Sequence, residues 1–141
     1  AKEFAFRVTL NGAEIGTGTG HSKKEAEQSA ACAALIGRNA AALGFAGRLR
    51  VMQLDYRAAI ERLAFEGERF DFAFLDAPYA SGFGPDAAGL LFARGLMRPD
   101  GRVFLEHASD GVAAPVAGVM RPVRTRRFGR CAVTEMERDR E

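Results

Sequence analysis

An apolar stretch at residues 70–75, followed at once by Asp-Ala-Pro-Tyr at residues 76–79, constrains the fold of this chain more than any other feature. A strand that is apolar on both faces is typical of the buried middle of a parallel sheet. In open α/β sheets, ligands bind just past the carboxyl ends of such strands. The stretch therefore predicts a central strand that ends in a functional loop.

Strand and helix patterns alternate on both sides of this stretch. They predict strands at residues 48–54 (ending at Asp55) and 103–107. An amphipathic helix is expected at residues 56–65, and a second helix at 86–97, closed by a turn at 98–101. The last element is a predicted hairpin of residues 120–128 and 131–136, which turns at Gly129. Alternating strands and helices are typical of parallel sheets. We therefore expect an α/β fold with a C-terminal β-hairpin.

The N-terminal segment has a different pattern. Residues 4–10 alternate between apolar and polar, which predicts a half-buried antiparallel strand. Asn-Gly at residues 11–12 is a strong hairpin signal, and a second strand is expected at 13–19. Ser22 and Glu25 form a capping box, so we expect a helix from there to about residue 43, ending at the glycine at position 44.

This strand–turn–strand–helix segment, with its glycines at residues 16–20 and Ser-Lys-Lys-Glu-Ala at 22–26, resembles the C-terminal half of a double-stranded RNA-binding domain. The domain that ends bacterial ribonuclease III is the most similar, over residues 1–35. Lys23 and Lys24 stand at a helix N-terminus, where the helix dipole and the ammonium groups both attract phosphate. The resemblance implies that they contact the phosphates of A-form RNA.

The glycines at residues 16–20 allow two further interpretations. A glycine-rich loop between a strand and a helix can bind a nucleotide, but the acidic partner should follow about twenty residues later, and Glu27 comes too early. Alternatively, the glycines only allow a twisted edge strand to bend.

The loop at residues 76–79 resembles the Asp/Asn-Pro-Pro-Tyr motif of S-adenosylmethionine-dependent methyltransferases that act on exocyclic amines of bases. The resemblance implies that Asp76 and the Ala77 carbonyl accept the two N–H bonds of the target amine. Pro78 would fix the turn, and Tyr79 would stack on the base. Ala77 departs from the motif's first proline, and an ordinary strand exit with a turn proline is the alternative.

A longer, collinear series of segments resembles the small-subunit ribosomal RNA guanine-N2 methyltransferase D family. The series comprises residues 27–29, 34–36, 38–39, 42–44, 49–51, Asp55, 70–79, 102–107 and 128–129. It implies a Rossmann-like class I methyltransferase fold, S-adenosylmethionine as cofactor and ribosomal RNA as partner.

The same resemblance assigns cofactor contacts to two further acids. Asp55 would accept from the adenine amine, and Glu27 would bind the ribose hydroxyls. Asp76 and Ala77 complete the predicted cofactor-binding set. Alternatively, Asp55 caps the helix that starts at Tyr56, and Glu27 lies on a solvated helix face.

Arginines cluster on the predicted C-terminal hairpin. Contact with RNA phosphates by Arg124, Arg126 and Arg127 is one interpretation, and a solvated sheet edge protected by charge is the other. His107 ends a predicted strand, where a structural role is favoured over that of a base.

Composition bounds the remaining possibilities. The 141 residues carry a net charge of +2, too small to establish a nucleic-acid partner. Cys32 and Cys131 are too far apart for metal-ligand spacing and are expected to be free thiols in a reducing compartment. We expect no membrane span, no metal and a cytoplasmic location.

The two resemblances predict a hybrid chain. Residues 1–35 would be a partial double-stranded RNA-binding domain, and residues 36–141 the C-terminal part of a methyltransferase domain. The predicted function is S-adenosylmethionine-dependent methylation of guanine N2 in small-subunit ribosomal RNA. The family's first strand and glycine-rich cofactor loop have no counterpart in this sequence. That leaves a non-catalytic double-stranded RNA-binding module as the alternative.

Overall fold

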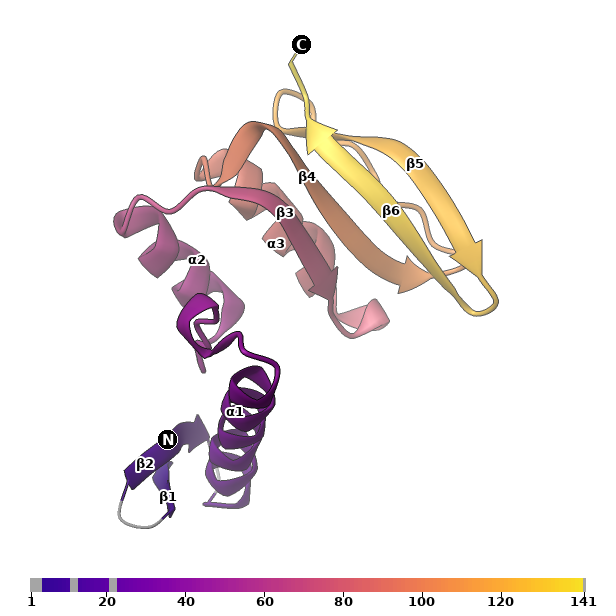
Figure 1. Cartoon of the computed structure of the whole chain (residues 1–141). Coiled ribbons are helices and arrows are strands. Elements are labelled where there is room, and N and C mark those ends of the chain that lie inside the picture. The colour runs from indigo at the N-terminus through magenta and orange to yellow at the C-terminus, as the bar shows by residue number, and fades with distance from the viewer. Residues whose placement is uncertain (1–3, 11–12, 21–22, 141) are drawn as a thin grey trace. The chain divides into compact units, whose positions relative to one another are not determined.

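The computed structural model describes residues 4–10, 13–20 and 23–140, which belong to two compact units (Figure 1). The N-terminal unit is Ala1–Leu54 and the C-terminal unit is Asp55–Glu141. The predicted boundary between residues 35 and 36 divides two sequence resemblances and stays a prediction.

The N-terminal unit is a β-hairpin packed on one long helix. Strands β1 (Phe4–Leu10) and β2 (Ala13–Gly20) pair antiparallel, and helix α1 (Lys23–Ala42) contacts both of them. A short 3₁₀ helix, η1 (Ala46–Arg48), follows. The two strands and the helix confirm the sequence-based prediction, whereas the Asn-Gly turn and the Ser22 cap lie outside the described residues.

Helix α1 ends in the turn that contains the glycine at position 44, as the sequence predicted, and the local geometry gives the reason. Gly44 has φ +74°, and its N–H donates to the Ala41 carbonyl at 3.1 Å. The N–H of Phe45 donates to the Ala40 carbonyl at 2.7 Å. These two bonds form a Schellman motif, in which the left-handed residue is usually glycine because it lacks a Cβ.

The glycines at residues 16–20 lie within β2 and pair with β1 in register. The nucleotide-binding interpretation of these glycines is therefore wrong, because a paired antiparallel strand does not form a loop that surrounds phosphate. A register shift between Val8 and Thr9, next to the pair formed by Val8 and Gly16, shows that the hairpin is irregular near the end of β1. That irregularity is compatible with the alternative in which glycine lets the strand bend.

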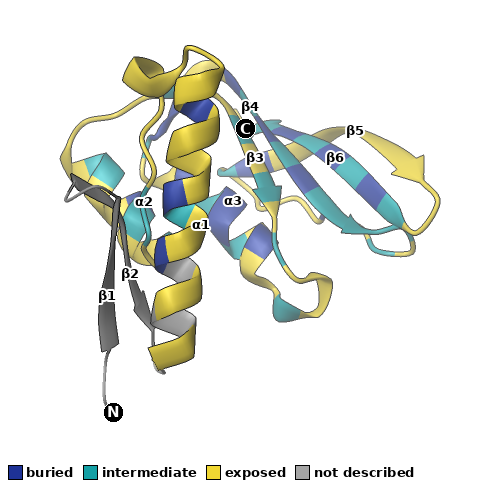
Figure 2. Cartoon of the chain, turned by 60° about the horizontal axis from the view of Figure 1, so that its bottom comes forward, coloured by how far each residue is buried: buried dark blue, intermediate teal, exposed yellow. Residues whose placement is uncertain are grey.

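Helix α1 is buried along a narrow stripe. Ala30, Ala34 and Ala40 are buried, whereas Glu27 and most other described side chains of the helix are exposed (Figure 2). Small side chains at the buried positions allow close approach of the helix backbone to its neighbours.

The C-terminal unit is a four-stranded mixed sheet with two helices. Its elements are α2 (Tyr56–Phe65), β3 (Phe70–Asp76), η2 (Tyr79–Ser81), α3 (Phe83–Ala93), β4 (Met97–Ala108), β5 (Met120–Phe128) and β6 (Cys131–Arg138). The strand order is β3-β4-β6-β5, in which β3 and β4 are parallel and the other pairs are antiparallel. The predicted α/β class and the closing hairpin are confirmed.

Only one face of this sheet is covered by the core of the unit. Val103, Leu105 and Met136 are buried in one cluster with Leu91 and Phe92 of α3. Burial alternates along β6, as expected for a sheet with one covered face.

Strand β3 is at the edge of the described sheet, so its prediction as a buried central strand is wrong. Its only hydrogen-bonded neighbour among the described strands is β4. As a result Phe72 is 63% exposed and Phe74 is 78% exposed. Phe74 stacks on Phe104 of β4, with ring centroids 4.9 Å apart.

The prediction of a strand at residues 48–54 is also wrong. Residues 46–48 form η1, and residues 49–54 contain no strand. A strand is defined by its pairing with a neighbouring strand, and neither of the described sheets includes residues 49–54.

Several boundaries differ from the prediction: helix α3 spans Phe83–Ala93 instead of 86–97, and β4 begins at Met97 instead of position 103. Helix α3 begins at Phe83 rather than at position 86, because Pro85 is accommodated in the first turn, where its missing N–H costs nothing. The turn at residues 98–101 lies inside β4, where the register with β3 is interrupted between Phe70 and Phe72.

Gly84 provides a sharp test of how α3 packs. A Cβ at this position would lie 2.6 Å from Cδ1 of Leu105, which is only 2% exposed. We expect Gly84→Ala to lower the free energy of unfolding of the C-terminal unit by about 1–3 kcal/mol through overpacking. The matched control is Gly89→Ala in the same helix, where an added Cβ would meet nothing within 4 Å beyond the helix's own backbone. This control substitution should raise the free energy of unfolding of the unit by up to about 1 kcal/mol, because alanine favours helix more than glycine does. Chemical denaturation measures both changes, and equal effects would contradict the close packing at Gly84.

Candidate functional site

The loop after β3 is a closed turn rather than a loose connection. Both the N–H and the hydroxyl of Ser81 donate to the Pro78 carbonyl, at 3.0 and 2.6 Å. The Ser81 hydroxyl also accepts from the Phe83 N–H at 3.2 Å, and Gly82 has φ +71°. These bonds fix the chain direction between β3 and α3, so Asp76 and Tyr79 are held at the carboxyl end of the strand.

Tyr79 is anchored by a residue that the sequence alone did not connect to it. Its hydroxyl donates to Oε1 of Glu106 at 2.7 Å, and its side chain is half exposed. This hydrogen bond favours the protonated phenol and, together with desolvation and the negative charge, raises the pKa of Tyr79 to about 12. The phenol therefore stays protonated throughout the physiological range and donates to Glu106.

Asp76 and Glu106 are directly opposite each other in the parallel register of β3 and β4. Asp76 is exposed, and its carboxylate has no partner among the residues that the structure describes. The arrangement places a free acceptor beside an oriented aromatic ring, which suits the recognition of a planar group that carries N–H donors.

Asp55 caps α2, as one of the two interpretations expected. One of its carboxylate oxygens accepts from the Arg57 N–H at 2.9 Å. The cap leaves the carboxylate further acceptor capacity, so the cap and the predicted adenine contact are compatible.

A polar cluster beside this cap was missed by the sequence analysis. The Tyr56 hydroxyl donates to Asp86 Oδ2 at 2.9 Å, and Arg57 Nη2 is 3.1 Å from the same oxygen. The ring of Tyr56 also contacts that of Phe83 at 5.5 Å between centroids. The cluster joins the start of α2 to the start of α3, next to the loop at residues 76–79.

The other predicted contacts belong to the N-terminal unit. Lys23 and Lys24 are exposed in the first turn of α1, where the RNA prediction requires them. Glu27 is exposed on the same helix. Their predicted roles in binding RNA and ribose stay predictions.

His107 has structural contacts. Its Nδ1 lies 2.9 Å from the Ala108 carbonyl, and since a carbonyl can only accept, Nδ1 carries the proton. Its Nε2 lies 2.8 Å from the hydroxyl of Thr134, which is fully buried and 2.8 Å from the hydroxyl of Thr125. The ring therefore completes a hydrogen-bonded chain across the sheet.

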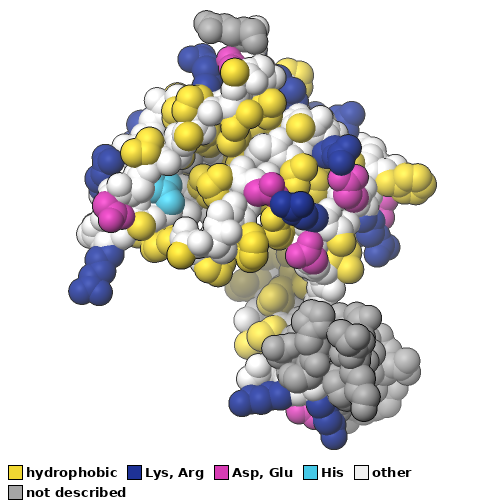
Figure 3. All heavy atoms as spheres, turned by 180° about the vertical axis from the view of Figure 1, so that it is seen from behind, with side chains coloured by type: hydrophobic (Ala, Val, Ile, Leu, Met, Phe, Trp, Pro, Cys, Tyr) yellow, Lys and Arg dark blue, Asp and Glu magenta, His cyan; other side chains and the backbone are white. Residues whose placement is uncertain are grey.

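The predicted RNA-binding arginines of the hairpin differ in their contacts. Arg124 pairs with Glu135 at 3.2 Å, and Arg127 donates to the Ser109 carbonyl at 2.9 Å. Arg126 is exposed without a contact among the described side chains. Arg124 and Arg126 line a small hollow of about 190 Å³ on the open sheet face, together with Phe104, Phe128, Val133 and Glu135. Lysines and arginines do not gather in a single patch on the face seen in Figure 3.

Neither a metal site nor a membrane-spanning helix is found among the described residues. Among the described residues, no group of three His, Cys, Asp or Glu side chains could hold a metal ion. No described helix is long and apolar enough to cross a membrane.

Solved structures identify the class of fold. A conserved hypothetical protein of Streptococcus pyogenes matches 75% of this chain and 64% of its own, with a TM-score of 0.66 at 23% identity. The Escherichia coli protein yhhF, assigned as a methyltransferase, matches 77% of this chain and 58% of its own, with a TM-score of 0.60 at 25% identity. The fold is the Rossmann-like class I fold of methyltransferases. This chain spans between 54% and 68% of the length of these two structures and of two further solved structures that it matches.

Residues 22–137 match the family described as conserved hypothetical protein 95. Because this match covers most of the chain, the chain belongs to that family. The family and its solved neighbours indicate a methyltransferase lineage, as the sequence analysis predicted.

The N-terminal segment matches a second family. Residues 1–36 match the double-stranded RNA binding motif. Over 34 residues the chain is 68% identical to ribonuclease 3 of Anoxybacillus flavithermus. These 34 residues are 24% of this chain and 14% of that protein. The predicted resemblance to the ribonuclease III domain is confirmed over this segment.

Proposed function

We propose that the C-terminal unit is the base-binding part of an S-adenosylmethionine-dependent methyltransferase that modifies the N2 amine of guanine in small-subunit ribosomal RNA. The observation that carries this proposal is the closed loop at residues 76–79, which presents a free carboxylate and an anchored aromatic ring at the carboxyl end of β3. Membership of a methyltransferase lineage supports it.

The chemistry of the target explains why these groups are useful. An exocyclic amine is a poor nucleophile because its lone pair is delocalised into the ring. Asp76 and the Ala77 carbonyl would accept the two N–H bonds and orient the lone pair outward. Tyr79, held by Glu106, would stack on a base that has left its helix. Methyl transfer to an oriented amine then depends mainly on proximity and alignment.

The residues present also fit the cofactor in chemical type. S-adenosylmethionine would supply the methyl group. Its adenine amine and its ammonium group are donors, and Asp55 and Asp76 both keep acceptor capacity at the same end of the sheet. Glu27 remains the proposed ribose contact.

Substitution of Tyr79 tests the proposal, because two variants separate its ring from its hydroxyl. Tyr79→Phe removes the hydrogen bond to the Glu106 carboxylate but keeps the stacking ring, so methyl transfer should fall by about tenfold, the effect of about 1.5 kcal/mol. Tyr79→Ala also removes the stacking surface, worth about 1–3 kcal/mol per base, and should cost a further factor of about 5 to 150.

The measurement is incorporation of radiolabelled methyl groups into small-subunit ribosomal RNA, with the product nucleoside identified by mass spectrometry. N2-methylguanosine is the expected product. Equal rates for the two variants would show that the ring does not hold the base, and a methyl group on another atom would refute the assigned target.

A second function is favoured by the N-terminal segment. The match to the double-stranded RNA binding motif and the exposed Lys23 and Lys24 support contact of α1 with RNA phosphates. In this proposal the N-terminal unit is an RNA-binding module, independent of catalysis. Duplex RNA binding that survives in a chain without methyl transfer activity would distinguish it from the first proposal.

A further inference from the structure

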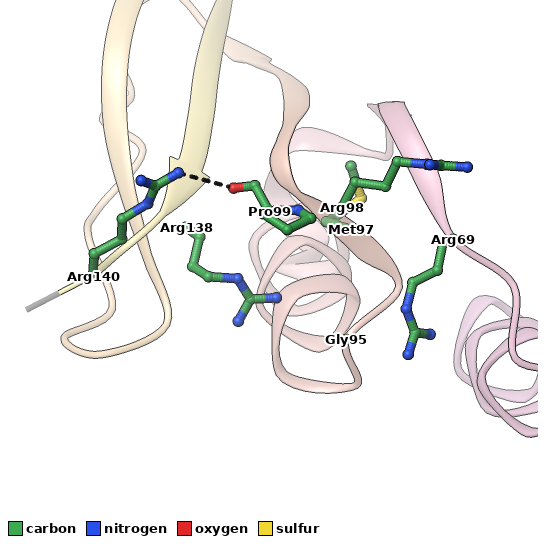
Figure 4. A pocket seen from close by; sticks show the side chains of 7 residues that line it. All are labelled: Arg69, Gly95, Met97, Arg98, Pro99, Arg138 and Arg140. Atoms are coloured by element: carbon green, nitrogen blue, oxygen red, sulfur yellow. Dashed lines mark hydrogen bonds between the residues drawn. The ribbon is translucent and has the colours of Figure 1, made fainter.

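Four arginines line a pocket at the end of the sheet away from the loop at residues 76–79. The pocket has a volume of about 550 Å³ and is lined by Arg69, Gly95, Met97, Arg98, Pro99, Arg138 and Arg140 (Figure 4). None of these residues belongs to the site described above.

The topology of the sheet separates the two sites. Arg69 directly precedes β3, Arg98 is near the start of β4, and Arg138 ends the antiparallel strand β6. The loop with Asp76 is at the opposite end of β3. With seven residues in this strand, the two sites are roughly 20 Å apart, at about 3.3 Å per residue.

Two of the arginines are positively charged groups without a carboxylate partner among the described residues. Arg69 Nη1 donates to the Glu68 carbonyl at 3.1 Å, and Arg138 Nη2 donates to the Phe92 carbonyl at 3.2 Å. The guanidinium of Arg138 also lies over the Phe92 ring, 5.8 Å from its centroid. Figure 4 shows the two side chains on either side of Gly95. Since a guanidinium has five N–H groups, both retain donors for a ligand.

The other two arginines have weak competitors. Arg98 is 3.4 Å from Asp71, and Arg140 is 2.8 Å from Asp100. The two carboxylate side chains are 70% and 90% exposed, so water screens both ion pairs. The arginines outnumber these carboxylates by two, and the pocket therefore favours an anion.

We propose that this pocket binds phosphate groups of the RNA backbone and forms a second RNA contact of the C-terminal unit. The planar fork of arginine matches the geometry of phosphate oxygens. The arginines line an open rim instead of enclosing a small ligand, which suits a polymer that runs across the surface. The assignment to RNA rests on the proposed function.

The separation of the two sites is compatible with one RNA molecule. RNA-binding domains can contact a duplex over about 16 base pairs, so two contacts about 20 Å apart can engage the same folded RNA. In this arrangement the arginine pocket positions the backbone and carries no sequence information, while the loop at residues 76–79 selects the base.

The test compares two charge-matched double variants of the full chain. Arg69→Gln with Arg140→Gln removes two charges from the pocket. The control, Arg62→Gln with Arg94→Gln, removes two exposed arginines of the same unit that are ion-paired with Glu66 and Glu61. Binding of a small-subunit ribosomal RNA fragment is measured over a range of salt concentrations.

Each lost phosphate contact should lower the slope of log affinity against log salt by about 0.7–0.9. The pocket variant should therefore lose about 1.4–1.8 from the slope, and the control should keep the parent value. An unchanged slope in the pocket variant, or an equal loss in the control, would overturn the proposal.

A third variant separates shape from charge. Arg138→Lys keeps the positive charge near Phe92 but loses the guanidinium fork, so it should weaken RNA binding at constant salt while changing the slope little. Unchanged RNA affinity in this variant would show that Arg138 does not contact the RNA. These readouts measure binding alone, so they remain decisive even if methyl transfer to guanine is not observed. Conversely, Tyr79→Ala could lose methyl transfer while its RNA affinity keeps the parent salt dependence. That result would assign the loss to the loop at residues 76–79 and not to the arginine pocket.

Discussion

Replacing Asp76 by alanine should reduce methyl transfer by about 10- to 150-fold and leave the fold intact. A hydrogen bond to a charged group is worth about 1.5–3 kcal/mol, and each 1.4 kcal/mol is a factor of ten in rate. The variant would lose the acceptor that orients the amine. Because Asp76 is exposed and has no partner among the described residues, the substitution removes no contact that holds the unit together.

The matched control for this substitution is Asp110→Ala. Asp110 is also an exposed acid, in the turn that follows β4. It should leave methyl transfer unchanged, and both variants should keep the circular dichroism spectrum of the parent chain. Asp76→Asn retains one carbonyl acceptor without the charge, so its rate should lie between those of the parent and Asp76→Ala. Parent-like incorporation by Asp76→Ala would remove this residue from the site.

Local signals account for the parts of the fold that were predicted correctly. Helix α2 was predicted at its observed bounds because Asp55 supplies a cap and the apolar residues recur with helical spacing. The end of α1 followed from Gly44, whose positive φ was expected at that position. The hairpin of β5 and β6 turns at Gly129, which also has a positive φ.

The incorrect predictions concern neighbours in space. The apolar run in β3 indicated burial on both faces, but burial also requires a strand beyond β3 and a layer over its second face. The described sheet has no strand there, and Phe72 and Phe74 are exposed. The segment at residues 48–54 is not a strand for the same reason.

The candidate site was predicted only as far as its residues are close in sequence. The loop at residues 76–79 could be recognised as a motif, and Pro78 correctly indicated a turn. The partner of Tyr79 is Glu106, 27 residues later, and this contact depends on the parallel register that places Glu106 opposite Asp76. Neither the register nor the arginine pocket, which combines three strand ends, is visible in the sequence alone.

The position of β3 at the edge also determines how well a cofactor can bind. In doubly wound folds the ligand occupies a crevice between two neighbouring strands at their carboxyl ends. Here β4 forms one wall beside β3, and the described sheet continues no further on the other side. In this unit the proposed cofactor contacts are Asp55, Asp76 and Ala77 alone.

We therefore expect S-adenosylmethionine to bind this chain at least about a hundredfold more weakly than it binds a methyltransferase whose sheet continues beyond the equivalent strand. The loss of three hydrogen bonds, each worth about 1 kcal/mol, corresponds to this factor at about 1.4 kcal/mol per tenfold. Calorimetric titration of the cofactor into this chain and into a methyltransferase with such a continued sheet makes the comparison. Asp55→Ala, measured beside Asp110→Ala, would show whether the remaining affinity depends on the predicted adenine contact. Micromolar binding by the parent chain would contradict the expectation and show that residues outside the sheet complete the crevice.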